Sequence, residues 1–197
     1  MTKLLHPSET LILSKIPETI RSRAENIRLI AFDVDGVLTD GSLFYSDTGE
    51  QLKRFNALDG HGFRMLQQSG IKVALITGRS GGIVTRRAAE LGISLLYQDA
   101  RDKGKLIENI ATEHQLTLEQ IAYMGDDIID LEALRKVGLA ATVPHAPFYI
   151  QQASHWVSTI AGGQGAAREL TDIILSAQGL LGAFLQGSTL VRGIAIQ

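Results

Sequence analysis

Short apolar segments that alternate with helix-like segments constrain the fold of this 197-residue chain more than any other feature. The segments at 28–33, 71–76, 121–124 and 139–143 have the continuous apolar character of strands buried on both faces of a parallel sheet. Strands that alternate with helices pair in parallel through right-handed crossovers. We therefore predict an α/β fold, a three-layer doubly wound parallel sheet of the Rossmann-like type, with residues 1–197 as one domain.

The remaining elements follow from helical spacing, glycines and turn residues. Two short strand-like segments flank a turn that contains Gly49, which predicts a β-hairpin insertion at about 42–56. The C-terminal tail at about 179–197 is apolar, but polar residues interrupt it well before the roughly 20 residues of a membrane-spanning helix, so we expect it to pack on protein. Helices are predicted at 9–25, 62–69, 82–91, 103–114, 131–137 and 166–178, with one more strand at 94–97.

Composition and charge exclude several classes of function. The chain has no cysteine, which excludes thiolate catalysis, disulfides and thiolate zinc sites, and fits a reducing compartment. We expect a cytoplasmic protein without a signal peptide, because no basic stretch followed by an unbroken apolar run opens the sequence. A net charge of −2 gives no long-range attraction to nucleic acid or to an anionic membrane, so we expect neither as a partner.

Two carboxylates follow the first predicted strand. Asp33 and Asp35 leave it together, and Gly36 lets the backbone turn sharply behind them. Carboxylates held close repel each other, and a divalent cation such as Mg²⁺ relieves this repulsion. A solvated turn explains an isolated Asp-x-Asp at least as well. The pair becomes informative only if further acids reach the same place.

Further acids follow the predicted strand 121–124. Asp126, Asp127 and Asp130 come directly after it, and ligands of such sheets bind beyond the carboxyl ends of the strands. These acids are therefore candidates for the same site as Asp33. Capping of the following helix is the alternative for Asp127, because acids near a helix N-terminus are favourable.

Groups suited to phosphate follow two other segments. Thr77 and Arg79 flank Gly78 at a strand end, where a hydroxyl, loosely held backbone amides and a guanidinium can bind phosphate oxygens. Lys103 opens a predicted helix and offers a compact positive charge to a transferring phosphoryl group. Taken singly, each is an ordinary loop or surface residue.

In chain order, these elements resemble the four motifs of the haloacid dehalogenase superfamily over essentially the whole chain. The resemblance implies a Mg²⁺-dependent phosphomonoesterase that transfers the phosphoryl group to Asp33 and then releases it to water. It implies that Asp35 is the general acid and base, and that Thr77 and Lys103 hold the phosphoryl oxygens. The matching positions are Asp33-x-Asp35, Thr77, Lys103 and Gly125-Asp126-Asp127.

The same resemblance implies a metal site. Mg²⁺ would be held by Asp33, the backbone carbonyl of Asp35 and Asp126, with Asp127 and Asp130 supporting these ligands from behind. Many relatives carry a cap domain over the site, but here only the hairpin and a short helix lie between Asp35 and Thr77. We therefore expect no cap domain, a site that is open in a monomer, and an oligomer in which the hairpins meet.

The sequence also resembles one capless branch of the superfamily, whose members form homotetramers. Their partner is a small phosphorylated sugar acid, the 8-phosphate of an eight-carbon keto acid used in lipopolysaccharide precursor synthesis. The match lies at 33–41, 55–56, 59–60, 77–79, 125–127 and 162–169. By this resemblance the substrate contacts are Asp35, Asn56, Ala57, Leu58, Asp59, Gly60, Arg64, Arg79, Arg87 and Lys103.

Several alternatives stay open. For Arg64 and Arg87 the alternative is a solvated helix face. Leu58 and Gln164 stand where the branch often has basic residues, and Pro144-His145 where it often has Ala-Asp, so the substrate could be another sugar acid, such as an acylneuraminate 9-phosphate. A catalytically silent oligomerisation or regulatory module is the alternative from a different class. A polynucleotide end phosphatase is disfavoured, because no basic stripe is interleaved with aromatic residues.

Overall fold

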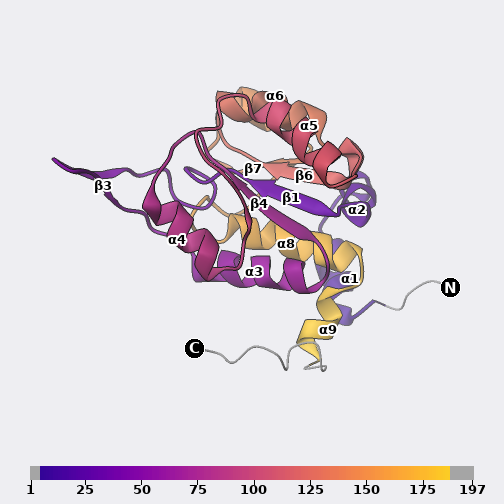
Figure 1. Cartoon of the computed structure of the whole chain (residues 1–197). Helices are drawn as coiled ribbons and strands as arrows, with labels where there is room; N and C mark the ends of the chain where they lie inside the picture. The colour runs from indigo at the N-terminus through magenta and orange to yellow at the C-terminus, as the bar shows by residue number, and fades with distance from the viewer. Residues whose placement is uncertain (1–4, 187–197) are drawn as a thin grey trace.

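A six-stranded parallel sheet runs through the middle of the computed structural model, which describes residues 5–186 (Figure 1). Its strand order is β5-β4-β1-β6-β7-β8, and every neighbouring pair is parallel. All residues of β1, β6 and β7 are buried, as their continuous apolar sequence predicts. The strands are β1 (Leu29–Phe32), β4 (Lys72–Ile76), β5 (Leu95–Tyr97), β6 (Ile121–Met124), β7 (Leu139–Thr142) and β8 (Trp156–Val157).

Helices cover both faces of the sheet, so the predicted three-layer α/β fold is confirmed (Figure 1). One face carries α5 (Lys103–Glu113) and α6 (Leu131–Lys136), and the other carries α3 (Ala57–Gln68) and α8 (Ala166–Ala177). Helix α4 (Gly82–Glu90) lies against α3, and α8 also contacts the two N-terminal helices. The buried side chains of the layers form one continuous apolar core.

The N-terminal part differs from the prediction of one helix over 9–25. Two helices form instead, α1 (Pro7–Leu13) and α2 (Glu18–Glu25). Pro17 precedes α2 in an extended conformation, and a proline has no N–H to continue a helix that arrives from before it. The prediction that α3 begins near residue 62 is also wrong, because Asn56 caps it earlier by accepting a hydrogen bond from the backbone of Leu58 at 2.8 Å.

Five short elements were not predicted: α7 (Phe148–Ala153), β8, α9 (Leu181–Leu185) and the 3-10 helices η1 (Leu118–Gln120) and η2 (Ile128–Asp130). They are too short for hydrophobic periodicity to separate them from loops. Of the predicted C-terminal tail, α9 packs on α1 and α8, and Leu181 is buried, while residues 187–197 lie outside the described part. No helix within residues 5–186 combines the length and apolar character needed to span a membrane.

The central position of β1 determines where the chemistry can lie. β1 pairs with β4 on one side and with β6 on the other, and Phe32 at its end lies beside Leu75 and Met124. The strands that follow β1 in the sequence are thus added first on one side of it and then on the other. In parallel sheets such a reversal of strand order leaves a crevice beyond the carboxyl ends of the strands. Asp33, Thr77 and Asp126 follow the three strands and so meet at this crevice.

The predicted hairpin forms, and it projects away from the core (Figure 1). Strands β2 (Phe44–Ser46) and β3 (Gly49–Leu52) make a separate two-stranded antiparallel sheet. Gly49 has φ +106°, the left-handed backbone that the turn requires. Among the described residues between Asp35 and Thr77, this hairpin and α3 are the only regular structure apart from the sheet strand β4, so there is no cap domain between them.

Two glycines let the loop after β1 fold tightly. Gly36 has φ +91°, and a Cβ there would lie 2.0 Å from Oδ2 of Asp126. A Cβ on Gly162 would lie 1.8 Å from the carbonyl oxygen of Gly36. Thr39 holds the loop from inside, because its Oγ1 accepts the backbone N–H groups of Gly36 at 3.3 Å and Gly41 at 3.2 Å. The loop after β1, the loop before α8 and Asp126 are therefore packed against one another without spare volume.

We expect Gly162→Ala to destabilise the protein by about 1–3 kcal/mol or more, because the new methyl group would displace the backbone of Gly36. Chemical denaturation measures this change in the free energy of unfolding. The matched control is Gly82→Ala at the first residue of α4, where a Cβ meets nothing within 4 Å and alanine is the better helix former. Equal stability of the two variants would contradict the tight packing of the loop.

Candidate active site

A cleft of about 500 Å³ opens at the carboxyl ends of β1, β4 and β6. Its walls come from the loops that follow these strands and from the loop before α5. Six of the predicted site residues line this one space, although they lie up to 94 positions apart in the chain, from Asp33 to Asp127. The lining residues are Asp33, Asp35, Thr77, Gly78, Arg79, Ala100, Arg101, Asp126, Asp127 and Ile129.

Lys103 lies beneath the cleft and joins two acids. Its Nζ donates hydrogen bonds to Oδ1 of Asp33 and Oδ1 of Asp130, both at 2.6 Å, and its side chain is completely buried. Burial alone would lower the pKa of Lys103, but the two carboxylates outweigh burial and raise it above its ordinary value. The lysine therefore stays charged inside the protein. Its position at the first turn of α5 is the one that the motif order indicated.

Asp130 is fully buried and uses both oxygens within the protein. Oδ1 accepts from Lys103 and from the hydroxyl of Tyr123 at 2.5 Å, while Oδ2 accepts the backbone N–H groups of Asp126 at 3.0 Å and Asp127 at 3.1 Å. Such a fully bonded carboxylate orients the loop around it rather than reaching into the cleft. This bonding supports the predicted role of Asp130 behind the metal ligands.

The charges at the base of the cleft fit a divalent cation. Carboxylate oxygens of Asp33, Asp126 and Asp130 lie within 4.8 Å of one another. Lys103 balances one of these three negative charges, which leaves two, the charge of one Mg²⁺. Oxygen donors of carboxylates are the ligands that this ion prefers. Because Asp130 is occupied, Asp33 and Asp126 are the acids with oxygens left for a metal.

The acids repel one another when no cation lies between them. Burial, followed by the charge of Asp130, raises the pKa of Asp33 well above its ordinary value, and Lys103 offsets only part of this. Burial and the charges of Asp130 and Asp127 raise the pKa of Asp126 to about 7. Asp127 also caps the short 3-10 turn Ile128–Asp130, so the capping alternative applies to it as well.

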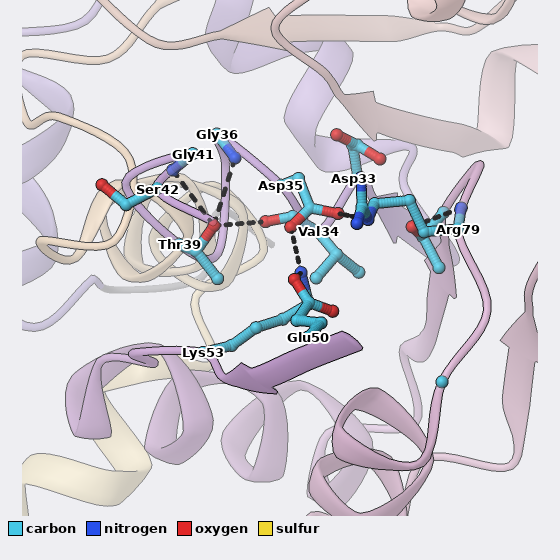
Figure 2. A network of polar contacts seen from close by, with 12 residues as sticks. Asp33, Val34, Asp35, Gly36, Thr39, Gly41, Ser42, Glu50, Lys53 and Arg79 are labelled. Atoms are coloured by element: carbon cyan, nitrogen blue, oxygen red, sulfur yellow. Dashed lines mark hydrogen bonds and ion pairs between the residues drawn. The ribbon is translucent and has the colours of Figure 1, made fainter. Parts of the chain in front are cut away.

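The Asp35 carboxylate lies between two cations on the other wall (Figure 2). Its Oδ1 accepts a hydrogen bond from Nζ of Lys53, and its Oδ2 lies 4.0 Å from Nε of Arg79. Lys53 also bonds to Oε1 of Glu50 at 2.7 Å, and its side chain is only 2 % exposed. Burial works to lower the pKa of Lys53, but its bonds to Asp35 and Glu50 outweigh burial and raise it. The base of the hairpin is thus tied to the loop after β1.

Thr77 and Arg79 occupy the wall that follows β4. The buried Thr77 accepts the backbone N–H of Arg79 on Oγ1 at 3.2 Å, which curls this loop toward the cleft. Arg79 donates from Nη2 to the hydroxyl of Tyr45 on β2, and its guanidinium lies 5.7 Å from the centre of that ring. Tyr45 therefore holds Arg79 at the rim, and Gly78 and Arg79, which follow Thr77, line the same cleft as Asp33.

The structure does not bring every predicted substrate residue to this cleft. Asn56, Asp59, Gly60 and Arg87 line a separate cavity of about 10 Å³, which has room for about one water molecule. Asp59 is 3 % exposed, and its Oδ1 accepts the backbone N–H of Arg168 at 2.8 Å. Its buried position, offset in part by this bond, raises its pKa to about 6. In the isolated subunit Asp59 thus joins α3 to α8.

Three further predicted contacts point elsewhere. Arg64 donates to the carbonyl of Glu90 at 3.2 Å, at the end of α4, so the alternative of a helix-surface role fits it in the isolated subunit. Ala57, the first residue of α3, is exposed outside the cleft. Leu58 is 57 % exposed and, with Gln164, lines a different cleft of about 560 Å³ between α1 and the start of α8. Leu58 and Gln164 therefore lie in one place away from Asp33 and Asp126, whereas His145 of the third departure lies beside Gly162, which packs against the loop after β1.

Sequence reasoning missed several residues that shape the site. Lys53, Glu50 and Tyr45 belong to a surface hairpin, and nothing in their local pattern indicates that they reach the loop after β1. Tyr123 gave a weak signal, because it is the one polar aromatic residue in an otherwise aliphatic buried strand. Arg101 precedes Lys103 by two positions and lines the cleft, a placement that depends on the turn before α5.

Comparison with known proteins gives consistent matches. A family model described as haloacid dehalogenase-like hydrolase matches residues 90–170. The 3-deoxy-D-manno-octulosonate 8-phosphate phosphatase KdsC of Escherichia coli (strain B / BL21-DE3) is 45% identical over 163 residues, which cover 82% of this chain and 86% of that protein.

Two solved structures extend this likeness to three dimensions. The 3-deoxy-D-manno-octulosonate 8-phosphate phosphatase of Yersinia pestis is 44% identical, with a TM-score of 0.82 over 84% of this chain and 89% of that one. The enzyme of the same name from Moraxella catarrhalis, solved with magnesium ion, phosphate ion and KDO, is 41% identical, with a TM-score of 0.83 over 85% of this chain and 96% of that one. This chain therefore belongs to the haloacid dehalogenase-like hydrolases, in the branch of the 3-deoxy-D-manno-octulosonate 8-phosphate phosphatases.

Proposed function

We propose that this protein hydrolyses 3-deoxy-D-manno-octulosonate 8-phosphate to the free sugar acid and phosphate, a step of lipopolysaccharide precursor synthesis. The observation that carries the proposal is the convergence of Asp33, Asp126 and Lys103 at one sheet edge, beside Asp35 and Thr77. The identity to named phosphatases over more than four fifths of the chain supports the substrate. This complete set of acids also argues against a catalytically silent module.

Asp33 acts as the nucleophile in this proposal. Its carboxylate attacks phosphorus, the new P–O bond forms as the ester P–O bond breaks, and the sugar oxygen leaves with a proton from Asp35. A water molecule then attacks the phosphorus of the aspartyl-phosphate and gives a proton to Asp35, and the P–O bond to Asp33 breaks. This releases phosphate, frees the Asp33 carboxylate and returns Asp35 to its protonated form. Lys103 orients Asp33 through their 2.6 Å bond and supplies positive charge beside the transferring group.

The residues of the opposite wall bind the phosphoryl oxygens. Thr77 offers a hydroxyl, and the loop after it offers backbone amides. Asp33, Asp126 and the backbone carbonyl of Asp35 would hold Mg²⁺, which would supply positive charge to the phosphoryl oxygens. Because the acids repel one another in its absence, cation binding and an ionised Asp33 support each other.

The substrate's second anion, the sugar carboxylate, requires cations at the rim. Arg79 and Arg101 both line the cleft, and guanidinium groups bind carboxylates through paired hydrogen bonds. We assign carboxylate binding to these two residues within the subunit. Contacts from Asn56, Leu58 and Arg87 belong to the proposal only through a neighbouring subunit or a change of shape, because their side chains face other cavities here.

A homotetramer working in the cytoplasm completes the proposal. The hairpin exposes Leu43, Phe44, Tyr45 and Leu52 by 46–59 %, and several large apolar side chains exposed on one small element are typical of a protein contact. Pairing of hairpins between subunits would bury these side chains next to the open cleft. The absence of cysteine is consistent with a reducing compartment.

Phosphate release from a panel of esters tests the proposed substrate. With Mg²⁺ present, we expect the highest kcat/KM for 3-deoxy-D-manno-octulosonate 8-phosphate, and loss of turnover to background in Asp33→Asn. Asp47→Asn, at the exposed hairpin turn, is the control and should keep full activity. A preference for an acylneuraminate 9-phosphate would retain the chemistry and overturn the substrate. No Mg²⁺-dependent release from any ester would favour the silent module.

Binding of Mg²⁺ should strengthen as pH rises. Asp126 has a pKa of about 7 in the metal-free protein and the pKa of Asp33 is also raised, so below pH 7 the cation must displace at least one proton, and affinity should rise by about tenfold or more per pH unit up to that value. The stability of the metal-free protein should instead fall as pH rises. The pKa of Asp126 is about 7 in the folded protein and 3.8 ordinarily, so between these pH values the folded protein binds more protons than the unfolded chain. The free energy of unfolding therefore decreases as pH rises from 3.8 to about 7.

Titration calorimetry from pH 5.5 to 8, with thermal unfolding in chelator, measures both trends. Asp126→Asn should lose the strong Mg²⁺ site and flatten the stability trend. A Mg²⁺ affinity that does not change between pH 5.5 and 7 in the wild type would contradict the assignment of this carboxylate to the metal.

A substitution in the hairpin tests whether this element forms the contact between subunits. We expect Phe44→Glu to lower the mass measured by light scattering, because it places a charge on the apolar surface that subunits would bury. Phe148→Glu is the matched control, since Phe148 on α7 is 71 % exposed and lies outside the hairpin. Equal masses for both variants and the wild type would place the contact elsewhere.

A further inference from the structure

Lys53 is more strongly held than a surface lysine would be. It follows β3 by one residue, yet its side chain is only 2 % exposed, and Nζ bonds to both Asp35 and Glu50. Its neighbour Arg54 provides the contrast. Arg54 is 58 % exposed and pairs with Asp40 at 3.0 Å, an exposed pair of the kind that contributes little to stability.

The position of Lys53 does not suit direct binding of a substrate anion. Its side chain is not among the residues that line the cleft, and its ammonium group already lies between two carboxylates. A phosphate or sugar carboxylate would have to displace one of these acids to reach it. The contact of functional interest is therefore the one to Asp35.

Asp35 has few other groups to orient it. Within residues 5–186, its other charged partner is Arg79, whose Nε lies 4.0 Å from Oδ2, beyond hydrogen-bonding distance. Arg79 is also bonded to Tyr45 and faces the cleft, where it is available to an anionic substrate. Lys53 is thus the partner that fixes the direction of the Asp35 carboxylate, and Glu50 fixes Lys53 in turn (Figure 2).

We propose that Lys53 is a positioning residue that holds the Asp35 carboxylate toward the leaving oxygen of the substrate. The inference rests on the proposed function, because it takes Asp35 as the group that protonates that oxygen. Precise placement of a proton donor contributes to the rate only if the leaving group needs the proton. The hairpin then has a part in catalysis through the lysine at its base.

Two esters with different leaving groups separate this role from a structural one. The sugar ester leaves as an alkoxide and needs a proton, whereas 2,4-dinitrophenyl phosphate leaves as a stable phenolate and does not. We compare kcat/KM, which ends at the first irreversible step and so excludes the later hydrolysis of the aspartyl-phosphate. In Lys53→Met we expect kcat/KM to fall on the order of 10²-fold for the sugar ester and to change little for the aryl ester.

Three further variants control the comparison. Lys53→Arg keeps a charged donor and should recover a large part of the activity on the sugar ester. Arg54→Met, at the exposed neighbour, should leave kcat/KM for both esters unchanged. The double variant Lys53→Met/Asp35→Asn should be no slower on the sugar ester than Asp35→Asn alone, because residues that act through one group are not additive.

Equal losses on the two esters, or no loss on either, would overturn the positioning role. Additive losses in the double variant would also overturn it, because Lys53 would then act independently of Asp35. These results leave the proposed function intact as long as the wild type hydrolyses both esters with Mg²⁺. A wild type that hydrolyses neither ester would overturn the proposed function itself.

Discussion

The buried bond between Lys103 and two acids is the interaction on which the site depends. Burying Asp33 and Asp130 without a cation would cost several kcal/mol for each charge, because a carboxylate loses its hydration in the protein interior. Lys103 contributes one positive charge at 2.6 Å from both. The remaining negative charge faces the cleft, where a divalent cation fits. The carboxylate charge that Lys103 does not neutralise is thus the basis of metal binding.

Close packing of the backbone keeps these charges in place. The loop after β1 contains Asp33, the proposed nucleophile, and it is enclosed by the side chain of Asp126, the loop at Gly162 and the inward hydroxyl of Thr39. The side chain of Asp126 leaves no room for a methyl group at Gly36, and the carbonyl of Gly36 leaves none at Gly162. Rigid packing of this kind limits the reorganisation needed during phosphoryl transfer, which is how preorganised charges contribute to rate.

Much of the fold and the catalytic centre could be predicted from the sequence, for a physical reason. β1, β4 and β6 are buried on both faces, so they appear as continuous apolar segments, and parallel pairing brings the residues after them to one edge. Asp33, Thr77 and Asp126 could be placed together on that basis alone. Lys103 required the resemblance as well, because a lysine at a helix start is usually exposed.

The residues that sequence reasoning missed, or that lie outside the cleft, are held by tertiary contacts. Lys53 and Tyr45 reach the catalytic loop only because the hairpin base folds back onto it, and a hairpin pattern contains no information about that direction. Asp59 matches a motif, but its burial against the backbone of Arg168 depends on how α3 meets α8. The division of the predicted helix 9–25 into α1 and α2 is the exception. Pro17 is present in the sequence, and its effect on a helix could have been predicted.

Two of the departures from the branch pattern lie apart from the acids of the cleft. The acids and Lys103 lie at the sheet edge, where packing and charge leave little freedom to vary. Leu58 and Gln164, two of the three departures from the branch pattern, line another cleft, so the positive charge missing there leaves the acids and Lys103 unchanged. Arg79 and Arg101 still face the cleft beside the acids. A chain of this architecture can therefore lose cations outside the sheet edge and keep both the phosphoryl-transfer site and the cations nearest to it.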